Sequence, residues 1–225
     1  MKVLKMHPWQ VTINEAACLQ RELSKRLQFR PLDLDRISYI AGADVSFSRG
    51  SDAVYAAAVV LSFPDLKIAE EKTSVVKATF PYIPGFLTFR EGPALVEVFK
   101  KVETIPDVIV FDGQGIAHPR GFGIASHMGL LLDKPSIGCA KSPLVGKYVE
   151  PGKERGSVSP LLKDGKEIGA VLRTRTGVAP VFVSAGNHID LPSSINIILR
   201  CAPRYRLPEP IRRAHFLSNK ARIKK

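Results

Sequence analysis

Cysteine, long apolar runs and internal repeats are scarce or absent in this chain of 225 residues. The cysteines, Cys18, Cys139 and Cys201, are scattered and form no CxxC pair, which argues against a zinc site or a disulfide framework and favours reduced, mostly buried thiols. No apolar run is long enough to span a bilayer, and the first residues lack the apolar stretch of a secretory signal. We therefore expect a soluble, cytoplasmic protein without membrane contact.

Positive charge is in excess. The chain has 33 Lys and Arg against 21 Asp and Glu, a formal net charge of +12, and a sequence pI of about 9.8. Such a surplus attracts polyanions, so nucleic acid is the leading partner, although the basic tail from Arg212 to Lys225 could be only a solvated end. With 45% hydrophobic residues and no Pro-, Gly- or Ser-rich linker, we expect one domain over 1–225, acting as a monomer.

The order of apolar patterns predicts a mixed α/β fold. Thr12, with Glu15 three positions later, resembles a capping box, and the helix that it opens should run to Arg30, before Pro31. Strands at 37–48, 53–63 and 66–76 are joined by short turns, which favours an antiparallel meander. We then expect a helix from Thr88, a buried strand at 108–111, a helix at 124–133, a buried strand at 136–140, strands at 167–175 and 180–188, and helices at 195–202 and 210–225. This order predicts a ribonuclease H-like mixed sheet, three antiparallel strands and then parallel strands, with helices on both faces.

Three acidic residues stand at unusual positions. Asp44 interrupts an apolar strand in AGADVSF, Glu91 lies in the first turns of a helix in TFREGP, and Asp112 ends a buried strand in VIVFDGQG. The strands of Asp44 and Asp112 are neighbours in the expected sheet, so their side chains can converge, with Glu91 in reach. A divalent cation such as Mg²⁺ would neutralise this cluster. Taken singly, Asp112 could be a turn residue and Glu91 a favourable charge at a helix start, whereas Asp44 is harder to explain without a ligand.

Loops rich in glycine and proline surround these carboxylates. DGQGIAHPRGFGIASH contains His118, and its glycines permit close approach of a base or a phosphate. Lys141, after a buried strand in IGCAKSPL, could meet the scissile phosphate or be an ordinary surface lysine. Tyr82, between the prolines of PYIPG, could be a wedge inserted into a duplex or a tyrosine buried in its loop.

His118 could contact a phosphate or the leaving group, or be merely structural. His215, on the basic last helix, could be a fourth metal ligand or a proton donor.

These segments resemble the endonuclease V family. ADVSF, PYIPGFLTFREGP, VIVFDGQGIAHPRGFGIASHMG, CAKSPL and RRAHFLS occur in the order of the family and span most of the chain. The resemblance implies a ribonuclease H-like DNA-repair nuclease that recognises deaminated bases, chiefly hypoxanthine (inosine). It implies cleavage of the second phosphodiester bond on the 3′ side of the lesion, leaving 3′-hydroxyl and 5′-phosphate, with Mg²⁺ or, as a substitute, Mn²⁺.

The resemblance also implies roles for individual residues. Asp44, Glu91 and Asp112 would be the catalytic, metal-binding carboxylates, and Tyr82 would separate the strands. His118 and Lys141 match positions near the scissile phosphate, and His215 a position where the family carries Asp or His. Gln114 stands where the family varies. The pocket for the flipped base would include Gly85, Leu87, Gly113, Gly123, Ile124, Gly138, Ala140 and Ser142.

Two other functions fit part of the pattern. Another enzyme of the same fold, such as a ribonuclease H or a junction resolvase, would share the acidic cluster but would need neither the PYIPGF wedge nor the glycine-rich pocket. A non-catalytic, basic nucleic-acid-binding module would tolerate alanine at Asp44 or Asp112. The sequence leaves open whether DNA or inosine-containing RNA is the main substrate.

Overall fold

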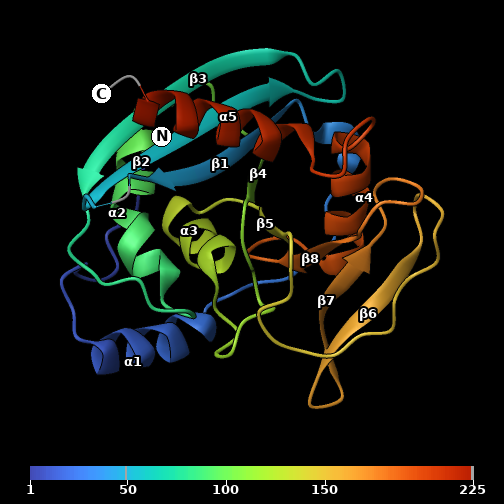
Figure 1. Ribbon diagram of the computed structural model, residues 1–225, viewed down its shortest axis with the longest axis horizontal. Helices are drawn as coiled ribbons and strands as arrows, with labels where there is room; N and C mark the ends of the chain where they lie inside the picture. Colours follow the sequence, from blue (N-terminus) through green and yellow to red (C-terminus); the bar gives the residue numbers. More distant parts are fainter. Residues whose placement is uncertain (49, 224–225) are drawn as a thin grey trace.

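The computed structural model describes residues 1–48 and 50–223, which form an eight-stranded sheet with helices packed on it (Figure 1). The strand order is β3-β2-β1-β4-β5-β8-β7-β6. β1, β2 and β3 form an antiparallel meander, β4 and β5 run parallel to β1, and the last three strands add antiparallel pairs. The expected mixed sheet is confirmed. Its strands are β1 (Tyr39–Phe47), β2 (Ala53–Ser62), β3 (Ile68–Lys77), β4 (Val108–Phe111), β5 (Ser136–Ala140), β6 (Val158–Lys163), β7 (Lys166–Leu172) and β8 (Val181–Ala185).

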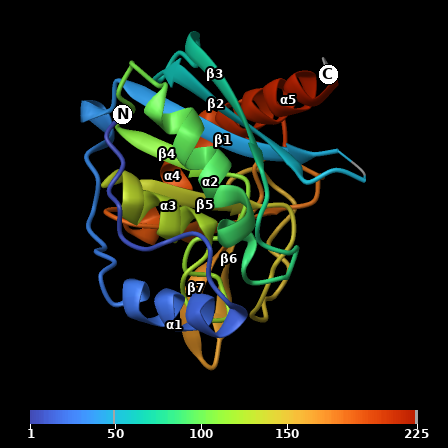
Figure 2. The same ribbon diagram turned by 90° about the vertical axis from the view of Figure 1, so that its left-hand side faces the viewer.

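Helices cover both faces of the sheet (Figures 1 and 2). Side chains alternate along a strand, so β4 sends Ile109 and Phe111 to one face and Val108 and Val110 to the other. The first face packs on α2 and α3, and the second on α4 and α5. Both apolar layers are continuous, which explains why β4 is apolar throughout. The helices are α1 (Ile13–Ser24), α2 (Leu87–Lys100), α3 (Ile124–Leu132), α4 (Leu191–Cys201) and α5 (Glu209–Ile223), with a 3₁₀ turn at Leu34–Arg36.

Two local expectations were wrong. The first helix ends at Ser24 and does not run to Arg30. Gln28 instead pairs with the turn after β8, through its N–H to Asn187 Oδ1 (3.2 Å) and its carbonyl to the N–H of His188 (2.7 Å). The strand β6, which contains Pro160, was not expected. It lies at the edge of the sheet, where a residue without an N–H is tolerated.

Close packing brings α5 onto the first strand. A Cβ atom at Gly42 of β1 would lie 2.1 Å from both the carbonyl carbon and the oxygen of Pro210 at the start of α5, so this position accommodates glycine only. Further along β1, Ser46 Oγ donates to the carbonyl of Ser218 at 2.9 Å. These two contacts fix the helix along β1 and carry its side chains to the site described below.

All three cysteines are unpaired within the described residues, with Cys139 and Cys201 buried and Cys18 exposed. No helix among residues 1–48 and 50–223 has both the length and the apolar character needed to cross a membrane.

Candidate active site

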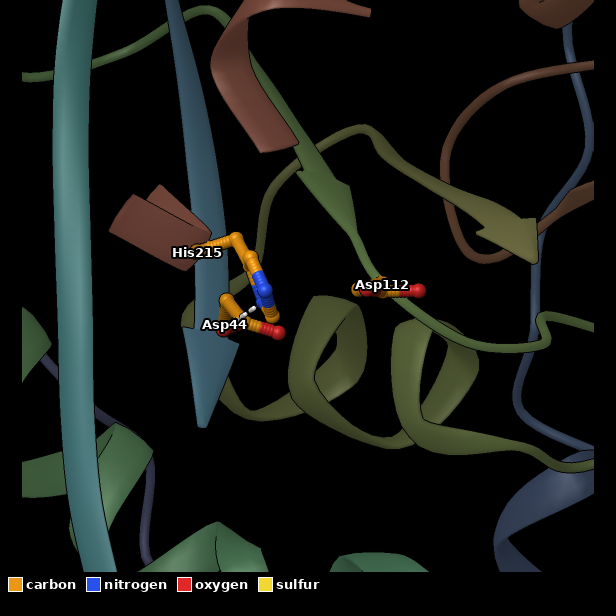
Figure 3. Close-up of side chains that lie close together, drawn as sticks. All are labelled: Asp44, Asp112 and His215. Carbon is orange, nitrogen blue, oxygen red and sulfur yellow. Dashed lines mark hydrogen bonds and ion pairs between the residues drawn. The ribbon is translucent and has the colours of Figure 1, made fainter. Parts of the chain in front are cut away.

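An acidic cluster forms where β1 and β4 lie side by side. Ala43 pairs with Phe111, so Asp44 near the end of β1 and Asp112 directly after β4 become neighbours. His215 of α5 reaches the same point (Figure 3). One ligand atom from each of Asp44, Asp112 and His215 lies within 4.8 Å of the others, which is close enough to share an ion.

The carboxylate of Asp44 is held by α5. Ser218 Oγ donates to Oδ2 at 2.7 Å, and His215 Nδ1 lies 3.1 Å from the same oxygen. The ring orientation follows from Asn219, whose Nδ2 donates to the carbonyl of His215 (2.8 Å) and lies 3.2 Å from Nε2. Because a carbonyl only accepts, the amide nitrogen must face His215. Its other hydrogen then points to Nε2, which leaves the ring proton on Nδ1, directed at Asp44.

Burial disfavours the ionised form of the Asp44 carboxyl group. Asp44 is 8% exposed, and desolvation raises its pKa above the usual value. The hydrogen bond from Ser218 opposes this rise, and the negative charge of Asp112 adds to it. The pocket therefore favours a positive charge beside Asp44.

Glu91 joins the site from α2. It lines a cavity of about 210 Å³ together with Asp44, Asp112, Lys141 and His215, although it is outside the group whose ligand atoms lie within 4.8 Å of one another. Burial, followed by repulsion from Asp44 and Asp112, raises the pKa of Glu91 well above its usual value. Three carboxyl groups around one small cavity offer hard oxygen donors that fit a divalent cation.

Lys141 lies at the site and not on a remote surface. It follows β5, and its Nζ donates to Asp112 Oδ2 at 2.6 Å, while the side chain remains 45% exposed. Arg206 holds the backbone at this point by donating Nη2 to the carbonyl of Lys141 at 2.8 Å. The ammonium group thus neutralises part of the cluster on the side that faces solvent.

A second cavity, of about 320 Å³, adjoins the first, and Leu87, Asp112, Ile124 and Lys141 line both. Gly138 does not line it. A Cβ there would lie 2.3 Å from the N of Gly115, so Gly138 lets β5 pack against the glycine-rich loop behind the cavity. The other residues that the sequence pointed to for a base pocket all line it: Gly85, Leu87, Gly113, Gly123, Ile124, Ala140 and Ser142.

Tyr82 and His118 also line this second cavity, but Tyr82 is exposed and His118 is buried. Tyr82 is 68% exposed, which excludes a tyrosine buried in its loop. His118 is 4% exposed, and both ring nitrogens are used within the protein: Nε2 bonds to the carbonyl of Gly85 (2.9 Å), and Nδ1 accepts from the N–H of Arg120 (3.2 Å). Desolvation lowers the pKa of His118 to about 4, so the ring is neutral at neutral pH. The structure does not bring His118 into the carboxylate cluster.

Sequence reasoning gave no role to three polar residues at or beside the site, Ser218, Asn219 and Gln114. Ser218 and Asn219 follow His215 by three and four positions, a helical spacing that could have indicated them. Gln114 ties the two loops together, since its Nε2 donates to the carbonyl of Ser142 at 3.0 Å. No local pattern could have indicated that bond.

This mixed sheet and its acidic edge define a nuclease of the ribonuclease H-like class. The chain matches one family over most of its length: the family model described as Endonuclease V covers residues 21–216. An Endonuclease V of Methanothrix thermoacetophila is 52% identical over 220 residues, which are 98% of this chain and 96% of that protein. The protein belongs to the endonuclease V family.

Solved structures of this family have the same fold. The crystal structure of the Endonuclease V from Streptomyces avermitilis has a TM-score of 0.92 and 41% sequence identity, and covers 100% of this chain and 99% of that one. Endonuclease V of Ciona intestinalis, in complex with a 24mer DNA containing an inosine followed by a ribo-adenosine, has a TM-score of 0.83 and 28% identity over 94% of this chain and 98% of that one.

Proposed function

We propose that this protein is a metal-dependent endonuclease that recognises deaminated bases, chiefly hypoxanthine, and hydrolyses the second phosphodiester bond on the 3′ side of the lesion. The products would carry 3′-hydroxyl and 5′-phosphate ends. The observation that carries the proposal is the adjacency of two cavities: one lined by carboxylates and one lined by glycine-rich loops, with Asp112 and Lys141 in the wall between them. The inosine-containing DNA bound to the Ciona relative supports the substrate class.

Asp44, Asp112 and Glu91 would hold the cation, which we propose to be Mg²⁺, with Mn²⁺ as a substitute. The donor set is dominated by carboxylate oxygens, and burial disfavours its negative charge unless a cation compensates. Bound there, such an ion would supply Lewis-acid polarisation of a phosphate oxygen and a more acidic attacking water.

The remaining residues would orient the substrate. Lys141, half exposed beside Asp112, is placed to meet a phosphate and to stabilise charge that develops on it. His215 directs its Nδ1 proton at Asp44 and thereby orients that carboxylate. The two hydrogen bonds of His118 lead us to assign it to positioning of the loops, in place of the phosphate contact expected from the sequence.

The second cavity would receive the extruded base. Hypoxanthine differs from adenine by a carbonyl at position six and a protonated N1, a pattern that backbone N–H and C=O groups can read. The glycines that line this cavity let the backbone approach a base closely, and inosine pairs weakly in a duplex, which lowers the cost of extrusion. The exposed Tyr82 at the rim would take the place of the displaced base. Inosine-containing RNA is a second candidate substrate.

A labelled duplex with one inosine tests this function. With Mg²⁺, the inosine strand should be cut at the second phosphodiester bond 3′ to the lesion, and Asp112→Ala should abolish the cut. Asp65→Asn is the control, because this exposed carboxylate lies in the turn at the far end of β2. Equal cutting of undamaged duplex would remove the lesion specificity. Cutting of an RNA–DNA hybrid irrespective of inosine would favour a ribonuclease H, and full activity of Asp112→Ala would exclude the proposed site.

A further inference from the structure

A buried glutamine of α1 joins the two loops that frame the second cavity. Gln20 is 1% exposed and lies far from these loops in sequence. Its Nε2 donates to the carbonyl of Gly85 in the PYIPG loop at 3.0 Å and to the carbonyl of Phe122 in the glycine-rich loop at 3.3 Å. Neither contact follows from the chemistry proposed above, which does not use Gln20.

The carbonyl of Gly85 receives more donors than a carbonyl normally has. Besides Gln20, His118 Nε2 donates at 2.9 Å and Arg120 Nη2 at 2.6 Å. A carbonyl oxygen has two lone pairs, so three donors converging on it restrict the orientation of its peptide unit. Gly85 itself has a φ of +80°, a backbone conformation that favours glycine.

The donors are in turn held in place. Arg120 Nε donates to Gln20 Oε1, and its guanidinium lies 4.1 Å from the ring centroid of Phe86. His118 accepts the N–H of Arg120 on Nδ1, so its proton is on Nε2, the atom that faces Gly85. Gln20 thus donates to Gly85 and also aligns a second donor to the same oxygen.

The PYIPG loop is therefore anchored at both ends. Arg90 Nη1 donates to the carbonyl of Phe80 at 2.8 Å before the loop, and the cluster around Gln20 holds Gly85 after it. Between the anchors, Pro81 and Pro84 restrict the backbone, and Tyr82 extends into solvent. The backbone that carries this aromatic side chain has thus lost much of its conformational freedom before any partner arrives.

We propose that Gln20 is a positioning residue for Tyr82, which sets where the tyrosine stands at the rim of the base cavity and so strengthens binding of the duplex around a lesion. The proposal rests on the function proposed above, because it assigns Tyr82 the role of the wedge. Without Gln20, the loop would have to be ordered during binding, and we expect affinity for an inosine duplex to fall roughly 3- to 15-fold.

A double-mutant cycle tests whether Gln20 acts through Tyr82. Affinity for a fluorescent inosine duplex is measured in metal-free buffer, which prevents cleavage, for wild type, Gln20→Ala, Tyr82→Ala and the double variant. We expect each single change to weaken binding and the double variant to bind no worse than Tyr82→Ala. Losses that multiply in the double variant, or full affinity of Gln20→Ala, would overturn the proposal.

Two further variants separate positioning from general damage. Gln20→Glu keeps an acceptor for Arg120 but loses the donor to Gly85, and should bind more weakly than wild type. Gln10→Ala, at an exposed glutamine of the same N-terminal segment, should bind like wild type. If Gln20→Ala does not fold, Gln20→Met preserves the volume and takes its place in the cycle.

Amide hydrogen exchange tests, without DNA, whether Gln20 anchors the loop. Exchange at residues 82–86 should accelerate in Gln20→Ala while β1 and β4 keep their protection. Unchanged exchange would overturn the anchoring role. A wild type that binds inosine and undamaged duplexes equally would instead reject the proposed function, and the exchange result would still show whether Gln20 holds the loop.

Discussion

Replacing Asp44 with asparagine should stabilise the metal-free protein. Asp44 is buried beside Asp112, so the two negative charges repel each other across a desolvated cavity. Asparagine has nearly the same shape, and its carbonyl oxygen can still accept from Ser218 and His215 as Oδ2 does now. The substitution therefore removes a charge without removing the hydrogen bonds that hold the side chain.

The separation in the structure sets the magnitude. One oxygen of each carboxylate lies within 4.8 Å of the other, and two unit charges at about that distance repel by about 3.5 kcal/mol at an effective dielectric constant of about 20. Lys141, 2.6 Å from Asp112, already offsets part of the charge of Asp112. We therefore expect a net gain of about 1–2 kcal/mol in the free energy of unfolding, which raises the melting temperature of a chain of this size by roughly 3–6 °C.

Thermal unfolding with and without a divalent cation measures both consequences. In EDTA, Asp44→Asn should melt above wild type. At a Mn²⁺ concentration about 100 times the dissociation constant, wild type should gain about 2.7 kcal/mol and the variant much less. Asp65→Asn, the same chemical change at an exposed turn, should leave both melting temperatures unchanged. The reasoning is refuted if Asp44→Asn melts below wild type in EDTA, or if Mn²⁺ stabilises both proteins equally.

Three further outcomes follow from the contacts around the site. Ser218→Ala removes the 2.7 Å donor to Asp44 and should weaken Mn²⁺ binding by about tenfold in calorimetry; equal affinity would show that Asp44 needs no such donor. Gly42→Ala places a Cβ 2.1 Å from Pro210 and should lower the free energy of unfolding in urea by about 1–3 kcal/mol, whereas an unchanged midpoint would contradict the close packing. His118, with its pKa lowered to about 4, binds a proton in the unfolded chain near pH 6.5 but resists it when folded. The neutral, buried ring makes its full contribution to the free energy of unfolding above pH 6.5. About 3 kcal/mol of this contribution is lost as the pH falls to about 4. Denaturant midpoints across this range should fall less in His118→Asn than in wild type, and equal slopes would count against a neutral, buried His118.

The parts of the fold that could be predicted from sequence are those with local causes. β4 is apolar throughout because both of its faces are covered, and the meander has short turns between strands of high β propensity. The end of α1 could not be predicted, because the contact of Gln28 with Asn187 spans much of the chain. β6 was missed for a similar reason, since its pairing as an edge strand outweighs the presence of Pro160.

The candidate site divides in the same way. The meeting of Asp44 and Asp112 could be predicted because β1 and β4 are parallel neighbours, and their register, with Ala43 beside Phe111, places the two carboxylates together. The protonation of His118 and the donors on Asp44 depend on which groups tertiary packing brings near, and residue type does not determine that. Gln20 was the hardest of these residues to predict. Its partner, Gly85, is distant in sequence, and the bond is made to a backbone carbonyl, which no sequence motif marks.

The shared wall between the cavities has a consequence for the reaction. Asp112 and Lys141 directly follow β4 and β5, which are buried, paired in parallel and packed on both faces. The sheet therefore fixes the positions of the two residues that line both cavities. On the proposed function, a base held in the second cavity presents one particular phosphate to the cluster. Changes in the PYIPG loop or at Gln20 should then alter how often a lesion is held, and so the rate of cutting, while the position of the cut relative to the lesion stays constant.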